Sequence, residues 1–149
     1  MELKWERVQR LCKELATEIK ECENIDDFQG IIAVTRGGLI PAGILSHELG
    51  LHRIDTIGFS SYHGKKQGAL VCVKQPDIID MTDLNKHIIV EDIVDSGTTL
   101  KALRDYFPLS WPVASLVVRC SVDDRPTYIG HIEETNEWVT FPWEKTDYS

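Results

Sequence analysis

The sequence predicts an α/β fold with a central, mostly parallel sheet of about five strands flanked by helices. Three apolar runs, at residues 30–35, 88–90 and 113–120, support this prediction. Continuous apolar runs are typical of strands that are covered on both faces. After the first two runs the chain passes through a short glycine-bearing loop into a helical pattern. Repeated strand–loop–helix units are typical of folds with a parallel sheet.

The other elements follow from local patterns. Residues 1–22 are predicted to form a leading amphipathic helix, because their apolar positions recur at helical spacing. Residues 39–50 form a second helix, with Gly50 as its C-terminal stop. Residues 54–60 and 69–74 have strand character, and a polar segment with two glycines lies between them. Such a segment is either a simple hairpin tip or a functional loop.

The most informative stretch follows the apolar run at residues 88–90. Glu91 and Asp92 are adjacent carboxylates where this strand is expected to end, and a loop with a third carboxylate, Asp95, follows. Small hydrogen-bond donors fill the rest of the loop: Ser96, Gly97, Thr98 and Thr99. A helical pattern over residues 100–107 comes next, so backbone N–H groups and the helix dipole would converge on an anion. The loop is therefore predicted to bind phosphate and the acidic pair a sugar diol or Mg²⁺, with an ordinary capped βα turn as the alternative.

A second loop of this kind follows the apolar run at residues 30–35. It contains Arg36 and two adjacent glycines, Gly37 and Gly38. Adjacent glycines expose backbone N–H groups as an anion nest, and a guanidinium makes forked hydrogen bonds to phosphate. The pattern favours a second anion site, and a plain tight turn is the alternative.

Composition indicates one globular domain covering residues 1–149. Hydrophobic residues make up 42% and charged residues 27% of the chain, which is usual for a soluble protein. The net charge of −8 counts against general nucleic-acid binding, because affinity for phosphate backbones comes from Lys and Arg. We find no apolar run that could cross a membrane and no signal-peptide core, so we expect a cytoplasmic protein. The four cysteines lack Cys-x-x-Cys spacing, as expected of thiols in a reducing compartment.

The segment Val90 to Thr99, VEDIVDSGTT, resembles the phosphoribosyl pyrophosphate (PRPP) motif of the type I phosphoribosyltransferases. The motif is long and chemically mixed, so the match is specific, and the likeness extends over residues 30–144. It implies the type I phosphoribosyltransferase fold with a small C-terminal purine hood at residues 127–149. It also implies a purine salvage enzyme that transfers the 5-phosphoribosyl group from PRPP to N9 of guanine, xanthine or hypoxanthine and releases pyrophosphate. Mg²⁺ would enter with PRPP, and the family's usual assemblies are homodimers and homotetramers.

The resemblance assigns roles within the PRPP motif. Four residues would hold the 5′-phosphate together with Asp95: Ser96, Gly97, Thr98 and Thr99. Asp95 would also be the proton acceptor at N7 of the base and therefore the catalytic residue. Glu91 and Asp92 would bind the ribose hydroxyls, with Asp92 also close to the Mg²⁺ ion.

The resemblance extends to two further loops. Arg36 and Gly37 would bind the pyrophosphate, which the family often holds beside an unusual cis peptide bond. Residues 61–75 would form a flexible lid over the site. Its candidate residues are Ser61, Tyr62, Lys65 and Lys66. Some relatives have an arginine near the end of the lid, where Gly68 stands here, and one of the two lysines could replace it.

The C-terminal segment from Trp138 to Glu144 resembles the purine hood of the bacterial xanthine–guanine phosphoribosyltransferases. Trp138 would stack on the base and the backbone of Val139 would read its edge, whereas the alternative for such an aromatic cluster is a core or subunit interface. Arg119 stands where the family has a Lys that donates to the 6-oxo group, and Glu144 stands where an Asp is usual. Both departures bear on base preference. The alternative for Arg119 is an ion pair with one of the acids at residues 123–124.

Two other functions stay open at the level of sequence. One is a phosphoribosyltransferase homologue with a regulatory, RNA-binding role, which would need a basic face. The other is a PRPP-using enzyme that acts on uracil or adenine. The hood segment favours an oxopurine over both bases.

Overall fold

The computed structural model describes residues 1–61 and 70–144. The strands are β1 (Phe28–Thr35), β2 (Ile54–Ser61), β3 (Leu70–Lys74), β4 (Lys86–Val94), β5 (Val113–Arg119) and β6 (Tyr128–Glu133). The helices are α1 (Trp5–Cys22), α2 (Leu39–Leu49) and α3 (Thr98–Tyr106), with 3₁₀ turns at Ile25–Asp27 and Asp83–Asn85. Gly50 adopts a left-handed conformation with φ 70° and ends α2, as predicted.

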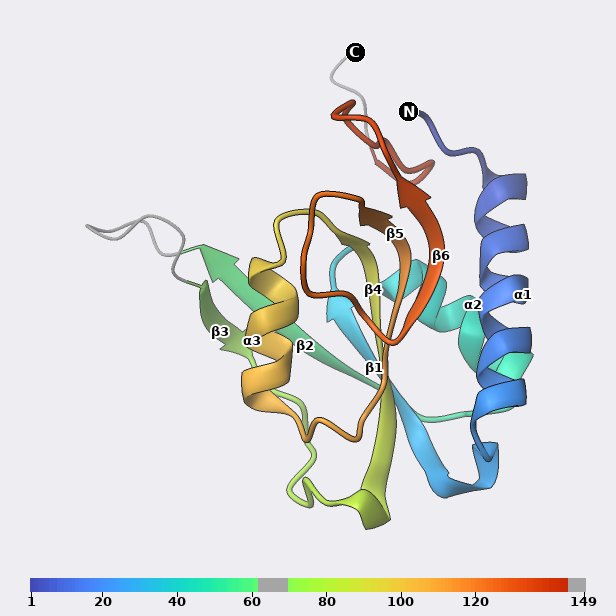
Figure 1. Ribbon diagram of the computed structural model, residues 1–149. Helices are drawn as coiled ribbons and strands as arrows, with labels where there is room; N and C mark the ends of the chain where they lie inside the picture. Colours follow the sequence, from blue (N-terminus) through green and yellow to red (C-terminus); the bar gives the residue numbers. More distant parts are fainter. Residues whose placement is uncertain (62–69, 145–149) are drawn as a thin grey trace.

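The strands form one sheet in the order β3-β2-β1-β4-β5-β6 (Figure 1). β3 pairs antiparallel with β2 at one edge, and every other neighbouring pair is parallel. The predicted α/β class with a mostly parallel sheet is confirmed. The sheet has six strands rather than about five, because both β3 and β6 join it at its edges.

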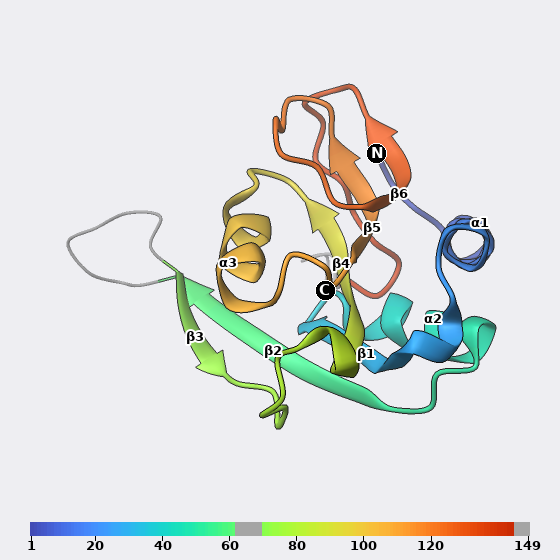
Figure 2. The same ribbon diagram turned by 60° about the horizontal axis from the view of Figure 1, so that its bottom comes forward.

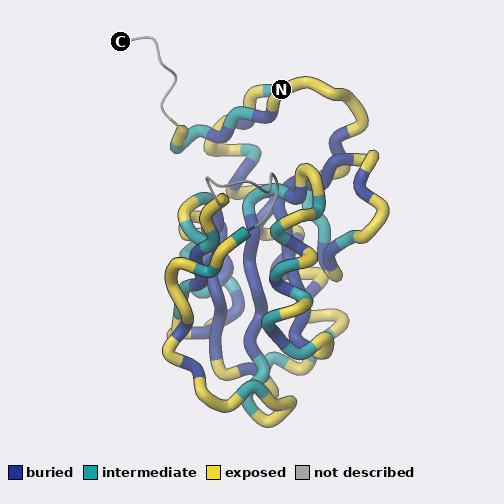
Figure 3. The backbone as a smooth tube through the Cα atoms, turned by 90° about the vertical axis from the view of Figure 1, so that its left-hand side faces the viewer, coloured by how far each residue is buried: buried dark blue, intermediate teal, exposed yellow. Residues whose placement is uncertain are grey.

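Helices cover both faces of the sheet (Figure 2). On β1, Ile31 and Ala33 pack in a cluster with α1 and α2, whereas Ile32 and Val34 pack in a second cluster with α3. Successive side chains of a strand point to opposite faces, so a strand that is covered twice needs apolar residues at every position. This requirement explains the unbroken apolar runs, and Figure 3 shows the central strands as the most buried part of the chain.

The two ends of the described chain differ from the sequence prediction. α1 begins at Trp5, and the residues before it are extended: the backbone N–H of Leu3 donates to the carbonyl of Thr140 at 2.9 Å. Residues 128–133, which we had placed in the hood, form β6 of the central sheet. The segment beyond the sheet therefore starts at residue 134, and its Val139 is buried in the same cluster as Leu3.

Candidate active site

The two loops predicted to bind anions lie side by side at the carboxyl ends of β1 and β4. These strands are parallel neighbours, so the loops that follow Thr35 and Val94 lie beyond the same end of the two strands. From β1 the chain continues to β2 on one side, and from β4 it continues to β5 on the other. This is a topological switch point, where α/β proteins bind ligands in the crevice beyond the strand ends.

The loop predicted to bind phosphate, residues 95–99, turns directly into α3. Gly97 has a φ of 86° and is the N-cap residue of α3. A glycine fits because this left-handed conformation is costly for other residues. It also has no side chain that could accept from the first-turn N–H groups. The Ser96 and Thr98 hydroxyls lie 3.0 Å apart, and Thr99 lines a cleft of about 240 Å³ between this loop and the end of β4.

The acidic pair lies inside β4 and not at its end, because the strand continues to Val94. Glu91 is buried, whereas Asp92 is partly exposed and lines the cleft. The backbone N–H of Asp92 donates to Oε1 of Glu91 at 3.2 Å, and Oδ1 of Asp92 accepts from the backbone N–H of Ile93 at 2.8 Å. Burial first, and then the hydrogen bond and charge of Asp92, raise the pKa of Glu91 well above its usual range. The charged form of Glu91 is therefore disfavoured, and Asp92 is the more exposed carboxylate of this pair.

The loop of Arg36 packs directly against the acidic pair. The Thr35–Arg36 peptide bond is cis. A Cβ atom on Gly37 would lie 1.8 Å from Oδ2 of Asp92, so only a glycine leaves room for this carboxylate. Arg36, Gly37 and Asp92 share a second cleft, of about 780 Å³, with Trp143 and Glu144. The structure thus brings together candidate residues from three separate segments.

Arg119 is paired with Asp95. It is the last residue of β5, and its Nε donates to Oδ1 of Asp95 at 2.7 Å. Its Nη1 donates to the carbonyl oxygen of Thr135 at 3.0 Å. The side chain of Arg119 is 10% exposed and that of Asp95 is 56% exposed, so Asp95 presents the more accessible end of the pair. Arg119 thus pairs with Asp95 rather than with an acid at residues 123–124, and Asp124 pairs with Arg104 at 2.9 Å.

The predicted hood residues are divided between the surface and the core. Trp138 is 75% exposed and lines neither of the two clefts. The side chain of Val139 is buried in the core. Glu144 lines the larger cleft together with Trp143, which stacks on Phe141 with ring centroids 4.7 Å apart. We had not singled out Trp143, and its place within the aromatic C-terminal cluster was the only sequence signal for it.

The predicted lid falls largely outside the described residues. Ser61 is exposed and is the last residue of β2. Tyr62, Lys65 and Lys66 lie outside the described residues. At the other end of the predicted lid, residues 70–74 are strand β3, paired with β2.

A family model described as a phosphoribosyl transferase domain matches residues 3–143. The chain belongs to the phosphoribosyltransferase family. Its sheet, flanking helices and switch-point loops are those of the type I fold, and it lies close to the bacterial xanthine–guanine phosphoribosyltransferases.

Individual relatives of this phosphoribosyltransferase are similar over nearly the whole chain. The xanthine-guanine phosphoribosyltransferase of Vibrio atlanticus is 36% identical over 140 residues, which are 94% of this chain and 86% of that protein. The crystal structure of a purine phosphoribosyltransferase from Pyrococcus horikoshii has a TM-score of 0.81 at 31% identity, over 98% of this chain and 95% of that one. The xanthine-guanine-hypoxanthine phosphoribosyltransferase of Helicobacter pylori, at 23% identity and a TM-score of 0.75 over 96% of this chain and 92% of that one, shares the fold.

Two carboxylates of the phosphoribosyltransferase, Asp92 and Glu144, line the larger cleft, and Asp92 lies against Gly37. Among the described residues, no group of three or more His, Cys, Asp or Glu side chains could hold a metal. Mg²⁺ does not need such a cage, because it usually binds through one or two carboxylates together with substrate phosphates and water. Asp92, beside the glycine loop, therefore fits a metal that arrives with its substrate.

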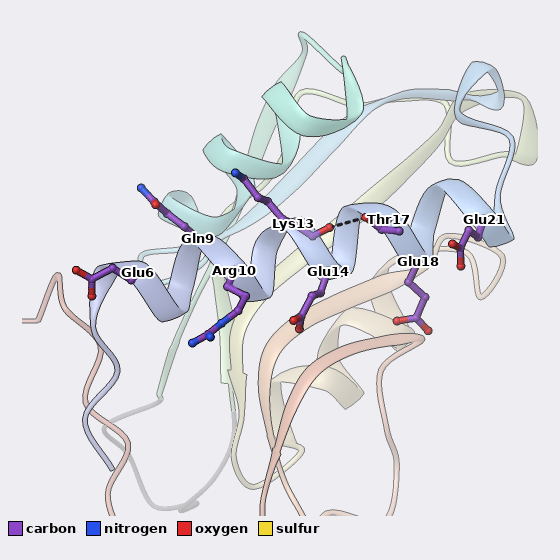
Figure 4. Close-up of a pocket in the computed structure, with 8 residues that line it drawn as sticks. All are labelled: Glu6, Gln9, Arg10, Lys13, Glu14, Thr17, Glu18 and Glu21. Atoms are coloured by element: carbon purple, nitrogen blue, oxygen red, sulfur yellow. Dashed lines mark hydrogen bonds between the residues drawn. The ribbon is translucent and has the colours of Figure 1, made fainter.

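A separate hollow on the outer face of α1 carries no comparable chemistry (Figure 4). Its lining side chains all come from this one helix and are of mixed charge, including Glu6, Arg10, Lys13, Glu14, Glu18 and Glu21. Side chains of a single solvated helix face cannot surround a ligand. Over the described ranges we also find no helix with both the length and the apolar character that a membrane span requires.

Proposed function

We propose that this phosphoribosyltransferase is a purine salvage enzyme, which transfers the 5-phosphoribosyl group from PRPP to N9 of a 6-oxopurine and releases pyrophosphate. The observation that carries the proposal is the arrangement at the carboxyl ends of the neighbouring strands β1 and β4. There a guanidinium-bearing glycine loop, an acidic strand segment and an uncapped helix N-terminus lie together. Each suits a different part of PRPP: the pyrophosphate, the ribose hydroxyls and the 5′-phosphate.

The 5′-phosphate binds in the loop of residues 95–99. Four residues supply its donors: Ser96, Gly97, Thr98 and Thr99. The backbone N–H groups at the start of α3 and the helix dipole favour the negative charge. Glu91 and Asp92 bind the ribose hydroxyls, and the carboxylate of Asp92 stabilises the positive charge that builds up as the bond to pyrophosphate breaks.

The leaving pyrophosphate binds to Arg36 and to the backbone of Gly37. A guanidinium suits this role because it makes forked hydrogen bonds to phosphate oxygens. A Mg²⁺ ion carried in by PRPP would be held by Asp92 and would neutralise part of the charge on the pyrophosphate. Ser61, Tyr62 and one of Lys65 and Lys66 belong to a lid that excludes water from this charged site.

The base is read by the Asp95–Arg119 pair. Asp95 offers an acceptor and takes the proton from N7, while Arg119 offers donors right beside it. A 6-oxopurine protonated at N7 presents the complementary pattern, a donor at N7 and an acceptor at O6. Adenine presents an amino group at position 6. This amino group and the guanidinium of Arg119 are both donors, so neither would find an acceptor.

The remaining hood residues complete the base site. The exposed ring of Trp138 is free to stack on a purine, and the backbone of Val139 reads the edge of the ring. Glu144, which stands where the family usually has Asp, lies at the rim of the cleft with Trp143. This exchange of acids adjusts the preference among the oxopurines.

Assembly and location follow the family. A homodimer or homotetramer is the expected assembly. The described cysteines are all free, which suits a reducing, cytoplasmic compartment.

The direct test is transfer activity on a panel of bases. Purified protein is mixed with Mg²⁺ and PRPP, and with guanine, hypoxanthine, xanthine, adenine or uracil, and nucleotide formation is measured. We expect nucleotide from at least one oxopurine and much less from adenine and uracil. Activity only on adenine or uracil would replace the substrate assignment, and no nucleotide from any base would overturn the proposed function.

A further inference from the structure

A chain of hydrogen bonds runs from the Asp95–Arg119 pair to the segment that follows β6. Arg119 uses two of its donors on protein: Nε on Asp95, and Nη1 on the carbonyl oxygen of Thr135 at 3.0 Å. A guanidinium is planar, so two such contacts fix both its position and the plane in which its other donors lie. The carbonyl of Thr135 therefore decides where Arg119 can point.

Thr135 is in turn held by Glu133. Oε1 of Glu133 accepts from the backbone N–H of Thr135 at 3.1 Å and from its hydroxyl at 3.0 Å. These two bonds, the backbone one first, lower the pKa of Glu133, so the carboxylate stays charged and the bonds remain charge-assisted. Glu133 is the last residue of β6 and is buried, and it lies opposite Arg119 in the β5–β6 register. It anchors Thr135 to the rigid sheet.

The other oxygen of Glu133 faces His131 of β6, and His131 in turn contacts Arg7 of α1. Nη2 of Arg7 lies 3.2 Å from Nδ1 of His131, and because a guanidinium can only donate, Nδ1 must be the acceptor. In neutral His131 the proton is then on Nε2, which lies 3.6 Å from Oε2 of Glu133. One oxygen of the carboxylate thus accepts two hydrogen bonds from Thr135, and the other lies near Nε2 of His131.

We infer that Glu133 and Thr135 are positioning residues for base recognition. They do not touch the base. They hold the Thr135 carbonyl where it orients the guanidinium of Arg119, and through Arg119 the carboxylate of Asp95. This inference rests on the proposed function, in which Asp95 and Arg119 read the N7 and O6 edge of an oxopurine. A pair that reads one edge of a ring must be set precisely, because a displacement of about 1 Å can cost on the order of 100-fold in rate.

The test compares two replacements of Thr135. Thr135→Val keeps the shape and removes the hydroxyl, whereas Thr135→Ser keeps the hydroxyl. Glu133→Gln removes the charge that holds Thr135, and Glu134→Gln makes the same change at the exposed neighbouring residue as a matched control. For each variant kcat/KM is measured with an oxopurine and with adenine, and the affinity for PRPP with Mg²⁺ is measured by calorimetry.

We expect Thr135→Val and Glu133→Gln to lower the oxopurine-to-adenine ratio of kcat/KM by roughly 10-fold to 100-fold. PRPP affinity should stay unchanged, and Thr135→Ser and Glu134→Gln should behave like the wild type. The effect should also disappear in an Arg119→Lys background, because an ammonium lacks the fixed fork that Thr135 orients.

Three results would count against the inference. An unchanged base ratio in Thr135→Val and Glu133→Gln, in an active enzyme, would overturn it and leave the proposed function standing. Parallel losses of PRPP affinity and base turnover would also overturn it, because they indicate a general structural role. A wild-type protein without transfer to any base would overturn the proposed function and this inference together.

Discussion

The carboxylate of Asp92 occupies the space that a side chain on Gly37 would need. A Cβ atom at residue 37 would lie 1.8 Å from Oδ2 of Asp92, closer than any non-bonded contact. Gly37 belongs to the loop after β1 and Asp92 to strand β4. This contact therefore joins the proposed pyrophosphate site to the proposed ribose and metal site. The two sites are therefore coupled by packing.

Gly37→Ala should displace Asp92 while leaving the fold intact, because the obstructing atoms are the end of a side chain. We expect weaker binding of PRPP with Mg²⁺ by calorimetry and little change in the thermal midpoint. Gly43→Ala is the matched control: it lies in α2 with no atom within 4 Å of the new Cβ, and should stabilise the protein by about 0.5–1 kcal/mol. Unchanged PRPP affinity in Gly37→Ala would show that the contact with Asp92 has no part in binding.

Replacing both Thr98 and Thr99 by Ala should weaken the binding of PRPP and of the nucleotide product. Each hydrogen bond lost to a charged group is worth about 1.5–3 kcal/mol. The helix should persist, because its N-cap is Gly97 and not a threonine. Calorimetry with the nucleotide is the measurement, and equal affinity in wild type and double variant would reject the assignment of the 5′-phosphate to this loop.

Asp95→Asn should lower turnover by about 10²–10⁴-fold, because it removes the proton acceptor for N7 and keeps the shape. The amide oxygen can still accept from Nε of Arg119, so the pair should survive and PRPP affinity should change little. Steady-state kinetics with an oxopurine checks the prediction. Near-normal turnover would mean that Asp95 only holds Arg119 in place.

Arg119→Ala should abolish most oxopurine turnover while PRPP binding is retained. The substitution removes the donor for O6. It also leaves Asp95 without the one side-chain partner that it has among the described residues. In the wild type we expect adenine to be used at least about 10-fold less efficiently than the best oxopurine, since stranding buried donors costs about 1–3 kcal/mol. Equal kcat/KM for adenine and oxopurine in the wild type would reject this role for Arg119.

Stability should fall in acid because of His87, a fully buried residue that packs against Trp111. Its Nδ1 lies 2.7 Å from the carbonyl of Asn85, so the proton is on Nδ1 and buried Nε2 is left without a partner. Burial lowers the pKa of His87 below 6.5. The unfolded chain therefore takes up a proton at higher pH than the folded one, and the free energy of unfolding decreases as the pH falls below 6.5.

His87→Phe should flatten this part of the pH profile, because the ring packing stays and the titration is lost. Urea unfolding at about pH 7.5 and about pH 5.5 measures the effect. The exposed His52 provides the control, since His52→Gln should leave the acid dependence as it is. A profile that is equally steep in His87→Phe would assign the acid sensitivity to other groups.

Much of the fold was predictable because its signals are local. Apolar runs revealed the strands, and Gly50 marked the end of α2, whereas α3 begins at Thr98, two residues before the predicted start. Both anion loops were also visible as short contiguous motifs. The residues of the edge strand β6 were placed in the hood, because nothing within Tyr128–Glu133 indicates that they join the central sheet.

The partners of buried charges could not be predicted, because they depend on which strands pair. The alternative for Arg119 was an acid close to it in sequence, whereas its partner Asp95 is 24 residues away and is brought near by the pairing of β4 with β5. Thr135 and Glu133 had no sequence signal, since a threonine and a glutamate near a strand end are ordinary. Their role depends on a backbone carbonyl, which every residue has.

Because Leu3 pairs with Thr140, the N-terminal segment can form all its contacts only after residue 140 has been synthesised. At about 5–20 residues per second, the start of the chain waits on the order of ten seconds for its partner to leave the ribosome. The loops at residues 36–38 and 95–99, by contrast, are made well before that moment. The C-terminal residues proposed to contact the base are therefore the last part of the site to leave the ribosome.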